Sequence, residues 1–315
     1  MIAYHILCHG NFKQVAQLVE ALYTPENTFL IDVDDGQQPD TRPIRNWLAR
    51  PNVHLTVDGD IGWGGAGTLR KTIRGAFRLL ELDPSWRYYV VLSGQDLPLK
   101  SNQAISETLA AGDADGINYI RINRPPTLEL ADLPVDNPGT DCVLWGDRGH
   151  TRVYAKPGTI NPQIGMYARR LVDVTEVGRG GEVYVGTADS LLLQRRENFF
   201  TQYPFHTGAN WFNLHRSLLE HMHSDPFAYE LFDVLRTTFI PDESYFQTYI
   251  MSSPFRERVS HHFGRLILRP GPIPRVKVLD MGDWDQIAAS NDLFARKFDT
   301  GHDRKLIQRV LSGRS

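Results

Sequence analysis

The chain has 315 residues, of which 41% are hydrophobic, so it can bury the core of one large α/β domain or two small ones. Its net charge is only -3 and its 34 Lys and Arg residues are scattered, which argues against nucleic acid as a partner. Cys8 and Cys142 are too few for a disulfide framework or a cysteine-based zinc site, and they favour a reducing compartment such as the cytoplasm. No apolar run reaches the roughly 18 residues of a spanning helix, so we expect no membrane anchor and at most a peripheral membrane association.

The N-terminal segment alternates strand and helix patterns. IAYHILCH (2–9) predicts a buried strand, NFKQVAQLVEALY (11–23) an amphipathic helix with Asn11 as N-cap, and TFLIDV (28–33) the next strand. NVHLTV (52–57), the helix TLRKTIRGAFRLLEL (68–82) and the strand-like YYVVLSGQDLPL (88–99) continue the alternation. We therefore expect a mostly parallel sheet flanked by helices.

The pattern loosens from about residue 120 to 200, where prolines are frequent. We expect one domain over residues 1–315 with an irregular insertion here, around an active site. Further along, DESYFQTYIMSS (242–253) predicts a helix that begins near Pro241 to Glu243, and PRVKVLDM (274–281) predicts another strand.

Two aspartates, Asp32 and Asp34, end the second predicted strand, where open parallel sheets bind ligands and often hold a ribose with an acidic residue. Residues i and i+2 share a strand face, so both carboxylates can reach a ligand, or one caps the following turn. A metal site is the weaker interpretation, because the remaining ligands of a calcium loop are missing.

The glycine cluster GWGGAG (62–67) matches neither a Walker A loop nor a dinucleotide-binding turn. It indicates either a close backbone approach to a ligand or a plain turn. In FIPDESYFQTY (239–249), Asp242 and Glu243 lie among aromatic residues, which raise the pKa of a carboxyl towards that of a useful general base. Carboxylates at a helix start also interact favourably with the helix dipole, and position alone leaves both interpretations open.

Seven segments follow one another in a diagnostic order: AYHILCH, ALYTPENTFLIDVD, WGGAGTLRKTIRGAFRLLEL, YYVVLSGQDLPLKS, GANWFNLHR, FIPDESYFQT and LFARKFD. Together they resemble the core-2/I-branching β-1,6-N-acetylglucosaminyltransferase family, which includes the peptide O-xylosyltransferases. The resemblance spans about residues 2 to 300, is weak between about 120 and 200, and is typical of a bacterial-type member.

The resemblance implies a Rossmann-like glycosyltransferase A-type fold and inverting transfer of a sugar from a UDP donor. Glu243 occupies the glutamate of the family's PDE motif and is the expected general base. No metal cofactor is expected, because basic side chains stabilise the leaving UDP. Lys297 matches the lysine of LFARKFD at the diphosphate, and Arg275 is the expected assistant, with Lys277 and Arg265 as alternatives.

The same resemblance assigns further contacts. Leu7, Asp34 and Trp63 are expected at the nucleotide, and Trp63 otherwise packs. Gln95, Asp96 and Asp242 are expected at the donor sugar or acceptor. Trp211 is expected to stack on a sugar ring or to be a core tryptophan.

The implied donor is UDP-GlcNAc, with UDP-xylose as its rival because FARKFD is also similar to the xylosyltransferase branch. The acceptor is expected to be a glycan or a lipid-linked saccharide of a bacterial surface or exopolysaccharide pathway. A sugar-nucleotide-binding protein without turnover is a second hypothesis. A nicotinamide-dependent oxidoreductase is a third, and it lacks the glycine fingerprint.

Overall fold

The computed structural model describes residues 1–34, 40–59, 64–123, 142–145, 152–155, 172–177, 183–187, 190–269 and 276–314. Of the described strands, seven form the central sheet in the order β14-β6-β13-β4-β1-β2-β3. Strands β1 (Ile2–Cys8), β2 (Thr28–Asp34), β3 (Val53–Asp58) and β4 (Tyr88–Ser93) are parallel. Strand β13 (Asn213–His215) runs antiparallel to β4 and β6 (Asn118–Tyr119), and β14 (Val259–Ser260) is parallel to β6. The sheet is mostly parallel, as the alternating pattern predicts.

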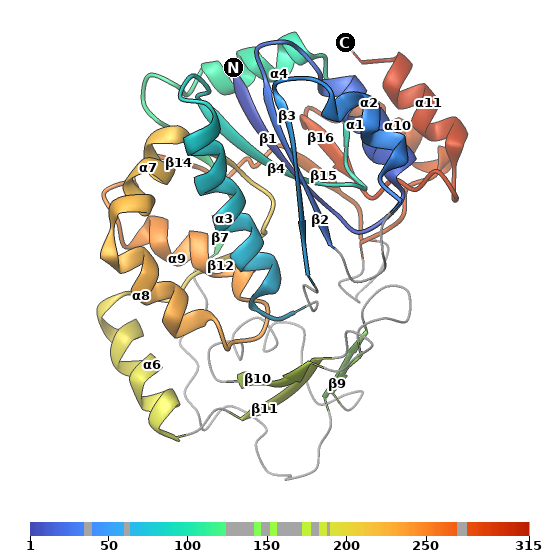
Figure 1. The fold of residues 1–315 in the computed structure, drawn as a ribbon. Coiled ribbons are helices and arrows are strands. Elements are labelled where there is room, and N and C mark those ends of the chain that lie inside the picture. The colour runs from blue at the N-terminus through green and yellow to red at the C-terminus, as the bar shows by residue number, and fades with distance from the viewer. Residues whose placement is uncertain are drawn as a thin grey trace.

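Helices cover both faces of this sheet (Figure 1). The first group comprises α1 (Phe12–Leu22), α2 (Arg45–Leu48), α4 (Asn102–Ala110), α10 (Trp284–Ala289) and α11 (Arg304–Ser312). The second comprises α3 (Ala66–Leu82), α6 (Ser190–Gln202), α7 (Arg216–Ser224), α8 (Pro226–Leu235) and α9 (Tyr245–Met251). Side chains alternate along β1, so Tyr4 and Ile6 join the core under the first group and Ala3 joins the core under the second.

Short elements complete the described structure. The three-stranded sheet β15-β16-β5 combines Arg265–Ile267, Phe294–Arg296 and Leu97–Pro98. Smaller strand pairs join β7 (Ile122–Asn123) with β12 (Thr207–Gly208), β8 (Cys142–Trp145) with β9 (Arg152–Ala155), and β10 (Val172–Val177) with β11 (Val183–Thr187). The 3-10 turns are η1 (Arg42–Ile44), η5 (Pro241–Glu243) and η6 (Met281–Asp283). No helix within the described ranges is long and apolar enough to cross a membrane.

Three sequence predictions need correction. Asn11 lies at the N-cap of α1, but its side chain makes no capping hydrogen bond and donates to Gln14 and Thr300 instead. Helix α9 begins only at Tyr245, so Glu243 lies in a separate 3-10 turn.

The strand predicted for 274–281 is wrong over 276–281, the part that the structure describes: residues 276–280 are irregular and Met281 begins η6. Here Lys277 N donates to Leu268 O, while Leu279 N donates to Lys297 O. The segment therefore bonds to two different neighbours and builds no continuous ladder. The insertion predicted for about 120–200 falls mostly outside the described residues.

Candidate functional site

The carboxyl ends of β1, β2 and β4 meet at one edge of the central sheet. Leu7 of β1 is paired with Asp32 of β2 and with Ser93 of β4. The turn that follows β4 folds back onto β1, because Gly94 N donates to Leu7 O at 3.0 Å. Leu7, the end of β2 and the turn that carries Gln95 and Asp96 therefore share this edge, where parallel sheets bind their ligands.

The two aspartates of β2 differ in their surroundings. Asp32 is 5% exposed, and its Oδ1 lies 3.0 Å from Nζ of Lys71 in α3, while His5 Nε2 lies 3.5 Å from its Oδ2. Burial raises the pKa of the Asp32 carboxyl, but hydrogen bonds and charges of His5 and Lys71 outweigh it and leave the pKa lowered. Asp34 is half-buried at the strand end, opposite Asp58 of β3. Asp32 is thus an internal ion-pair partner, and Asp34 is better placed for a ligand.

The turn after β4 brings in the C-terminal part of the chain. Asp96 is fully buried, accepts a hydrogen bond from Ser93 N, and its Oδ1 lies 3.7 Å from Arg296 Nε. The neighbouring Gln95 is half-buried, and its backbone O accepts a hydrogen bond from Phe298 N at 2.8 Å. Lys297 therefore lies next to this turn, although about two hundred residues separate them in the sequence.

Trp211 contributes a ring to the same place. The guanidinium carbon of Arg296 lies 3.7 Å from the Trp211 ring centroid, which is cation–π geometry. The other side chains packed against Trp211 belong to the core under α3. Arg296 therefore covers that face of the Trp211 ring, and a sugar cannot stack on the same face as the sequence analysis expected.

The 3-10 turn η5 carries Asp242 and Glu243. Asp242 is buried, and its Oδ2 accepts a hydrogen bond of 2.6 Å from Asn210 Nδ2, next to Trp211. Glu243 is half-buried. Gly64, with φ of 86°, holds the preceding segment, because its O accepts a 2.7 Å hydrogen bond from Ile240 N. A Cβ on Gly64 would lie 2.6 Å from Phe239, so the close approach made by the glycine cluster here is to this side chain.

The basic residues expected at the diphosphate have different surroundings. The backbone of Lys297 is fixed on both sides, by Lys277 O and by Leu279 N, and its side chain is half-buried. Lys277 Nζ already pairs with Asp283 at 2.7 Å and with Asp280 at 3.2 Å. Arg265 is buried and donates to Val91 O and Asn213 Oδ1. Both alternatives to Arg275 are therefore committed to internal contacts, while Arg275 and Trp63 lie outside the described residues.

Arg296 was missed by the sequence interpretation, although it precedes Lys297 in LFARKFD. It is buried in β16, where its guanidinium lies between Asp96 and Trp211. Burial lowers its pKa, and the charges of Asp96 and Glu243 oppose that effect. A charged residue within an otherwise apolar strand is the signal that the sequence offered.

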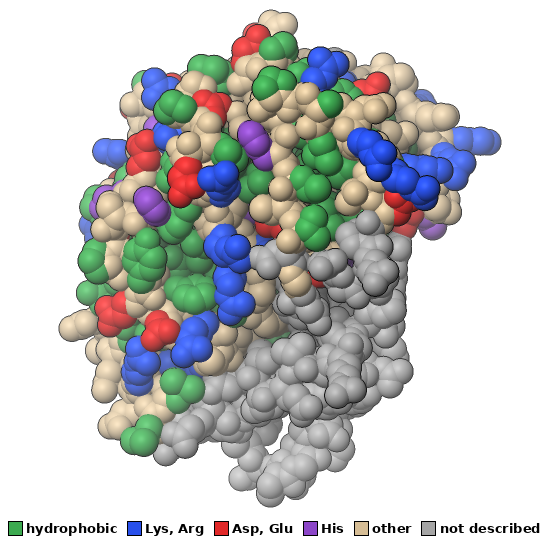
Figure 2. All heavy atoms as spheres, in the orientation of Figure 1, with side chains coloured by type: hydrophobic (Ala, Val, Ile, Leu, Met, Phe, Trp, Pro, Cys, Tyr) green, Lys and Arg blue, Asp and Glu red, His purple; other side chains and the backbone are tan. Residues whose placement is uncertain are grey.

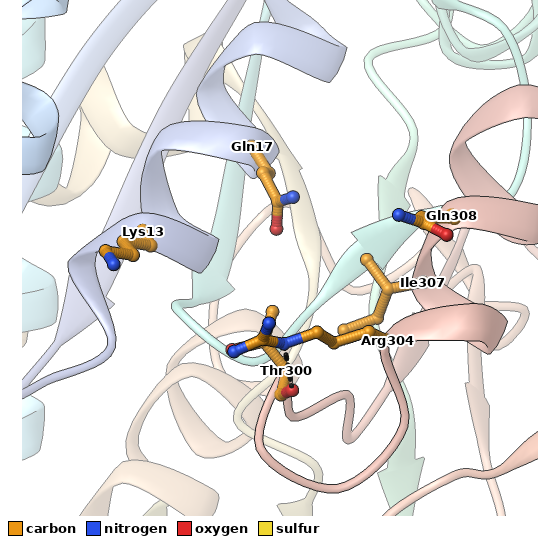
Figure 3. A pocket seen from close by; sticks show the side chains of 6 residues that line it. All are labelled: Lys13, Gln17, Thr300, Arg304, Ile307 and Gln308. Carbon is orange, nitrogen blue, oxygen red and sulfur yellow. Dashed lines mark hydrogen bonds between the residues drawn. The ribbon is translucent and has the colours of Figure 1, made fainter.

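A separate cavity of about 290 Å³ lies between α1 and α11 (Figure 3). The guanidinium of Arg304 extends beneath Gln17 towards α1, and its Nε donates to Thr300 O at 3.2 Å. None of the predicted site residues lines this cavity. Within the described ranges, no group of three or more His, Cys, Asp or Glu side chains is arranged to hold a metal ion.

Comparison with known protein families shows which family the chain belongs to. The family model described as "Branch: Core-2/I-Branching enzyme" matches residues 2–123 and 185–268, which is more than half of the sequence. The chain belongs to the Core-2/I-branching enzyme family. The matched ranges contain Leu7, Asp34, Gln95, Asp96, Trp211 and Glu243. Lys297 and Arg296 lie beyond them.

The known proteins that this chain resembles include transferases of two kinds. A zebrafish (Danio rerio) "Beta-1,3-galactosyl-O-glycosyl-glycoprotein beta-1,6-N-acetylglucosaminyltransferase 4" is 28% identical over 39% of this chain and 29% of its own length. "Xylosyltransferase oxt" of Drosophila melanogaster is 29% identical over 38% of this chain and 14% of its own. The chain thus spans less than a third of either relative. The solved apo structure of mouse xyloside xylosyltransferase 1 covers 94% of this chain and is itself covered to 97%, at 9% identity and a TM-score of 0.39, too low for any conclusion.

Proposed function

We propose that this Core-2/I-branching family member is an inverting glycosyltransferase that moves a sugar from a UDP donor to a hydroxyl of a glycan acceptor. One observation carries the proposal. Glu243, the carboxylate of the family's PDE motif, is half-buried on a turn whose Asp242 is bonded to Asn210, beside Trp211 and Arg296. The relatives named for N-acetylglucosaminyl and xylosyl transfer support the reaction class.

The proposed reaction is a direct displacement. The acceptor oxygen forms a bond to the anomeric carbon while the bond from that carbon to the diphosphate oxygen breaks. The acceptor proton passes to Glu243, and UDP leaves with the electron pair. A half-buried carboxylate suits this step, because the acceptor can reach it while protein surrounds the rest of the group.

The leaving UDP is stabilised by basic side chains in this proposal, without a metal. Lys297 is the proposed cation, because its backbone is fixed beside the Gln95 turn. Leu7 and Asp34 are the proposed uridine contacts, and Gln95 is proposed to face the donor sugar or acceptor. Asp96, expected there as well, is fully buried and instead holds the turn that carries Gln95, through its hydrogen bond from Ser93 N. The mostly parallel sheet with helices on both faces suits a glycosyltransferase A-type fold.

The proposed location is the cytoplasm or the periphery of a membrane. This location suits an enzyme that uses a nucleotide-sugar donor.

UDP-GlcNAc is the proposed donor, and UDP-xylose is the second candidate. The motif LFARKFD around Lys297 and the xylosyltransferase relatives favour the second. The proposed acceptor is a glycan, as the names of the N-acetylglucosaminyltransferase relatives suggest, or a lipid-linked saccharide.

A UDP-release assay tests donor class and metal use together. The purified protein is given UDP-GlcNAc, UDP-xylose or UDP-glucose with simple saccharide acceptors, with and without EDTA. We expect release from UDP-GlcNAc that EDTA leaves unchanged. Strong inhibition by EDTA would overturn the role assigned to Lys297, and silence with every donor would overturn the function.

The variant Glu243→Gln tests the base. We expect turnover to fall by about 10²- to 10⁴-fold, the usual contribution of general base catalysis, while UDP binding measured by calorimetry is kept. Glu257→Gln is the matched control, because Glu257 is an exposed glutamate paired with Arg256. Equal loss of turnover and UDP binding in Glu243→Gln would mean that Glu243 is structural.

A further inference from the structure

The cavity between α1 and α11 has two basic side chains in its wall. Its lining consists of Lys13, Gln17, Thr300, Arg304, Ile307 and Gln308, so none of the described residues that line it is acidic. Lys13 and Arg304 form no ion pair with any residue that the structure describes. A hollow lined by charges of one sign attracts ions of the opposite sign and raises their local concentration. The cavity therefore favours an anion.

The two helices contribute matching side chains to this cavity. On α1, Lys13 is followed four residues later by Gln17, and on α11, Arg304 is followed four residues later by Gln308. Residues at i and i+4 are neighbours on one helix face. Figure 3 shows Gln17, Arg304 and Gln308 directed into the space between the two helices. Each helix thus presents one cation and one amide.

Most hydrogen-bond donors of these side chains have no protein partner among the described residues. Arg304 uses only Nε, which donates to Thr300 O at 3.2 Å. The side chains of Lys13, Gln17 and Gln308 donate no hydrogen bond to a described residue, and Gln17 Oε1 accepts none. Phosphoryl oxygens accept several hydrogen bonds at once, and their bonds to guanidinium groups are among the strong ones. This set of donors therefore matches a phosphate group.

The carboxylate that precedes Arg304 in the sequence does not neutralise the cavity. Asp303 is the N-cap of α11, and its two oxygens accept hydrogen bonds from Leu306 N at 3.0 Å and from Met281 N at 2.9 Å. All charged residues within α11 itself are basic. Figure 2 shows Lys and Arg side chains gathered on the side of the molecule where Figure 1 places α1, α2 and α11. The surroundings of the cavity thus add to its attraction for anions.

The volume of the cavity limits the size of the ligand. At about 290 Å³ it lies at the lower end of the roughly 300–1,000 Å³ that small-molecule pockets occupy. This space suits a phosphate group esterified to a short alcohol better than it suits a whole nucleotide.

We propose that the cavity between α1 and α11 is a second binding site, which takes the phosphate group of a phosphate ester between Lys13 and Arg304, with the amides of Gln17 and Gln308 as further hydrogen-bond donors. The site is distinct from the one proposed for sugar transfer, because none of the residues predicted for that reaction lines the cavity. The inference therefore does not depend on the proposed function.

Calorimetry and thermal melting with glycerol 3-phosphate test the site. We expect one molecule bound per chain and a melting temperature that rises with ligand concentration, because the ligand binds the folded protein only. Arg304→Gln and Lys13→Gln should each weaken the affinity by about tenfold or more, since each substitution removes a hydrogen bond between charged groups. Both side chains are exposed, so we expect both variants to fold.

Lys305→Gln is the matched control. Lys305 is the next residue of α11, is exposed as well, and does not line the cavity, so this variant should keep most of the affinity. An equal loss in Lys305→Gln and Arg304→Gln would mean a diffuse attraction to the charged surface and would overturn the inference. A wild-type protein that binds no glycerol 3-phosphate overturns it as well. So does displacement of the ligand by an equal concentration of UDP, which would place it in the candidate transfer site.

Sedimentation with lipid vesicles distinguishes the two sources of a phosphate ester. Vesicles of phosphatidylcholine with phosphatidylglycerol present glycerol phosphate headgroups, and vesicles of phosphatidylcholine alone are the control. Cosedimentation that depends on Arg304 and Lys13 more than on Lys305 assigns the site to a lipid headgroup. Binding of glycerol 3-phosphate with cosedimentation that is absent, or that depends equally on Lys305, assigns the site to a soluble phosphate ester.

Discussion

Asp32 and Asp34 stand two residues apart on β2, yet the structure gives them different surroundings. Lys71 and His5 hold Asp32 inside the protein, while Asp34 stays at the half-buried strand end. The shared-face argument allowed both carboxylates to reach a ligand, or one of them to cap the following turn. Asp32 does not face a ligand because Lys71 of α3 pairs with it. The sequence does not show which helix residue contacts which strand residue.

Lys71→Met tests the internal pair. The substitution leaves the Asp32 carboxylate buried without its ammonium partner, so we expect the free energy of unfolding to fall by about 3–5 kcal/mol. Urea denaturation measures this change. Arg42→Gln is the control, because Arg42 forms an exposed pair with Asp40 at 2.7 Å and such pairs contribute little.

The same pair predicts a pH dependence with a definite sign. The pKa of Asp32 is lowered in the folded protein, so the pair stabilises fully above the ordinary carboxyl pKa. This stabilisation is lost as pH falls through the lowered value. The difference in stability between wild type and Lys71→Met should therefore narrow in acid, and a difference that widens would contradict the assignment.

The candidate site was only partly predictable from the sequence. The structure links Asp96 to Trp211 through Arg296, and Asp242 to the neighbouring Asn210, while the substrate roles assigned to these residues and to Glu243 stay predictions. Lys277 and Arg265 had seemed suitable for a diphosphate, but both are engaged by internal partners. Arg296 escaped notice because adjacency to Lys297 does not tell which neighbours its side chain meets.

At the scale of elements, the prediction succeeded where the hydrophobic period is long. Strand β1, helix α1 and strand β2 lie within one or two residues of the predicted ranges. The sheet β15-β16-β5 was not predicted, because its strands of two or three residues show no measurable period. The position of the segment around Lys297 depends on this small sheet, so this part of the site required the structure.

Gly64 tests how the glycine cluster supports η5. In Gly64→Ala a Cβ meets Phe239, and the residue also has φ of 86°, which only glycine adopts without strain. We expect the unfolding free energy to fall by about 1–3 kcal/mol, and turnover to fall because the segment before Glu243 shifts. Thermal melting and UDP release measure the two effects.

Gly10→Ala is the control for this prediction, because a Cβ at Gly10 meets nothing within 4 Å. We expect it to keep the stability of the wild type. A stable and fully active Gly64→Ala variant would mean that the contact with Phe239 does not position η5.

At the scale of the whole molecule, the buried Gln14 of α1 connects distant parts of the chain. Its Nε2 donates to Gly94 O at 3.0 Å and to Phe298 O at 2.9 Å. Its Oε1 accepts from Thr300 N at 2.9 Å. One side chain thus joins the turn after β4 to the segment that carries Lys297.

Gln14→Ala should therefore affect both stability and nucleotide binding. The backbone groups left without partners are buried, so we expect a loss of about 1–3 kcal/mol in unfolding free energy. UDP affinity should weaken as well, because Lys297 loses part of its support. Gln103→Ala is the control, since Gln103 is exposed and bonds only to Glu107 nearby. Unchanged UDP affinity in a destabilised Gln14→Ala would contradict the proposed coupling.

The Gln14 junction also affects how sequence variation in this protein should be interpreted. Gln14 and Phe298 are 284 positions apart, yet a change at either end disturbs the same joint. In a mutational scan scored by activity, Gln14 would therefore rank with the residues proposed to touch the substrate. Ranking by activity alone would then overstate the number of residues in the active site. Only a parallel measurement of abundance or folding would distinguish structural residues such as Gln14 from residues that contact the substrate.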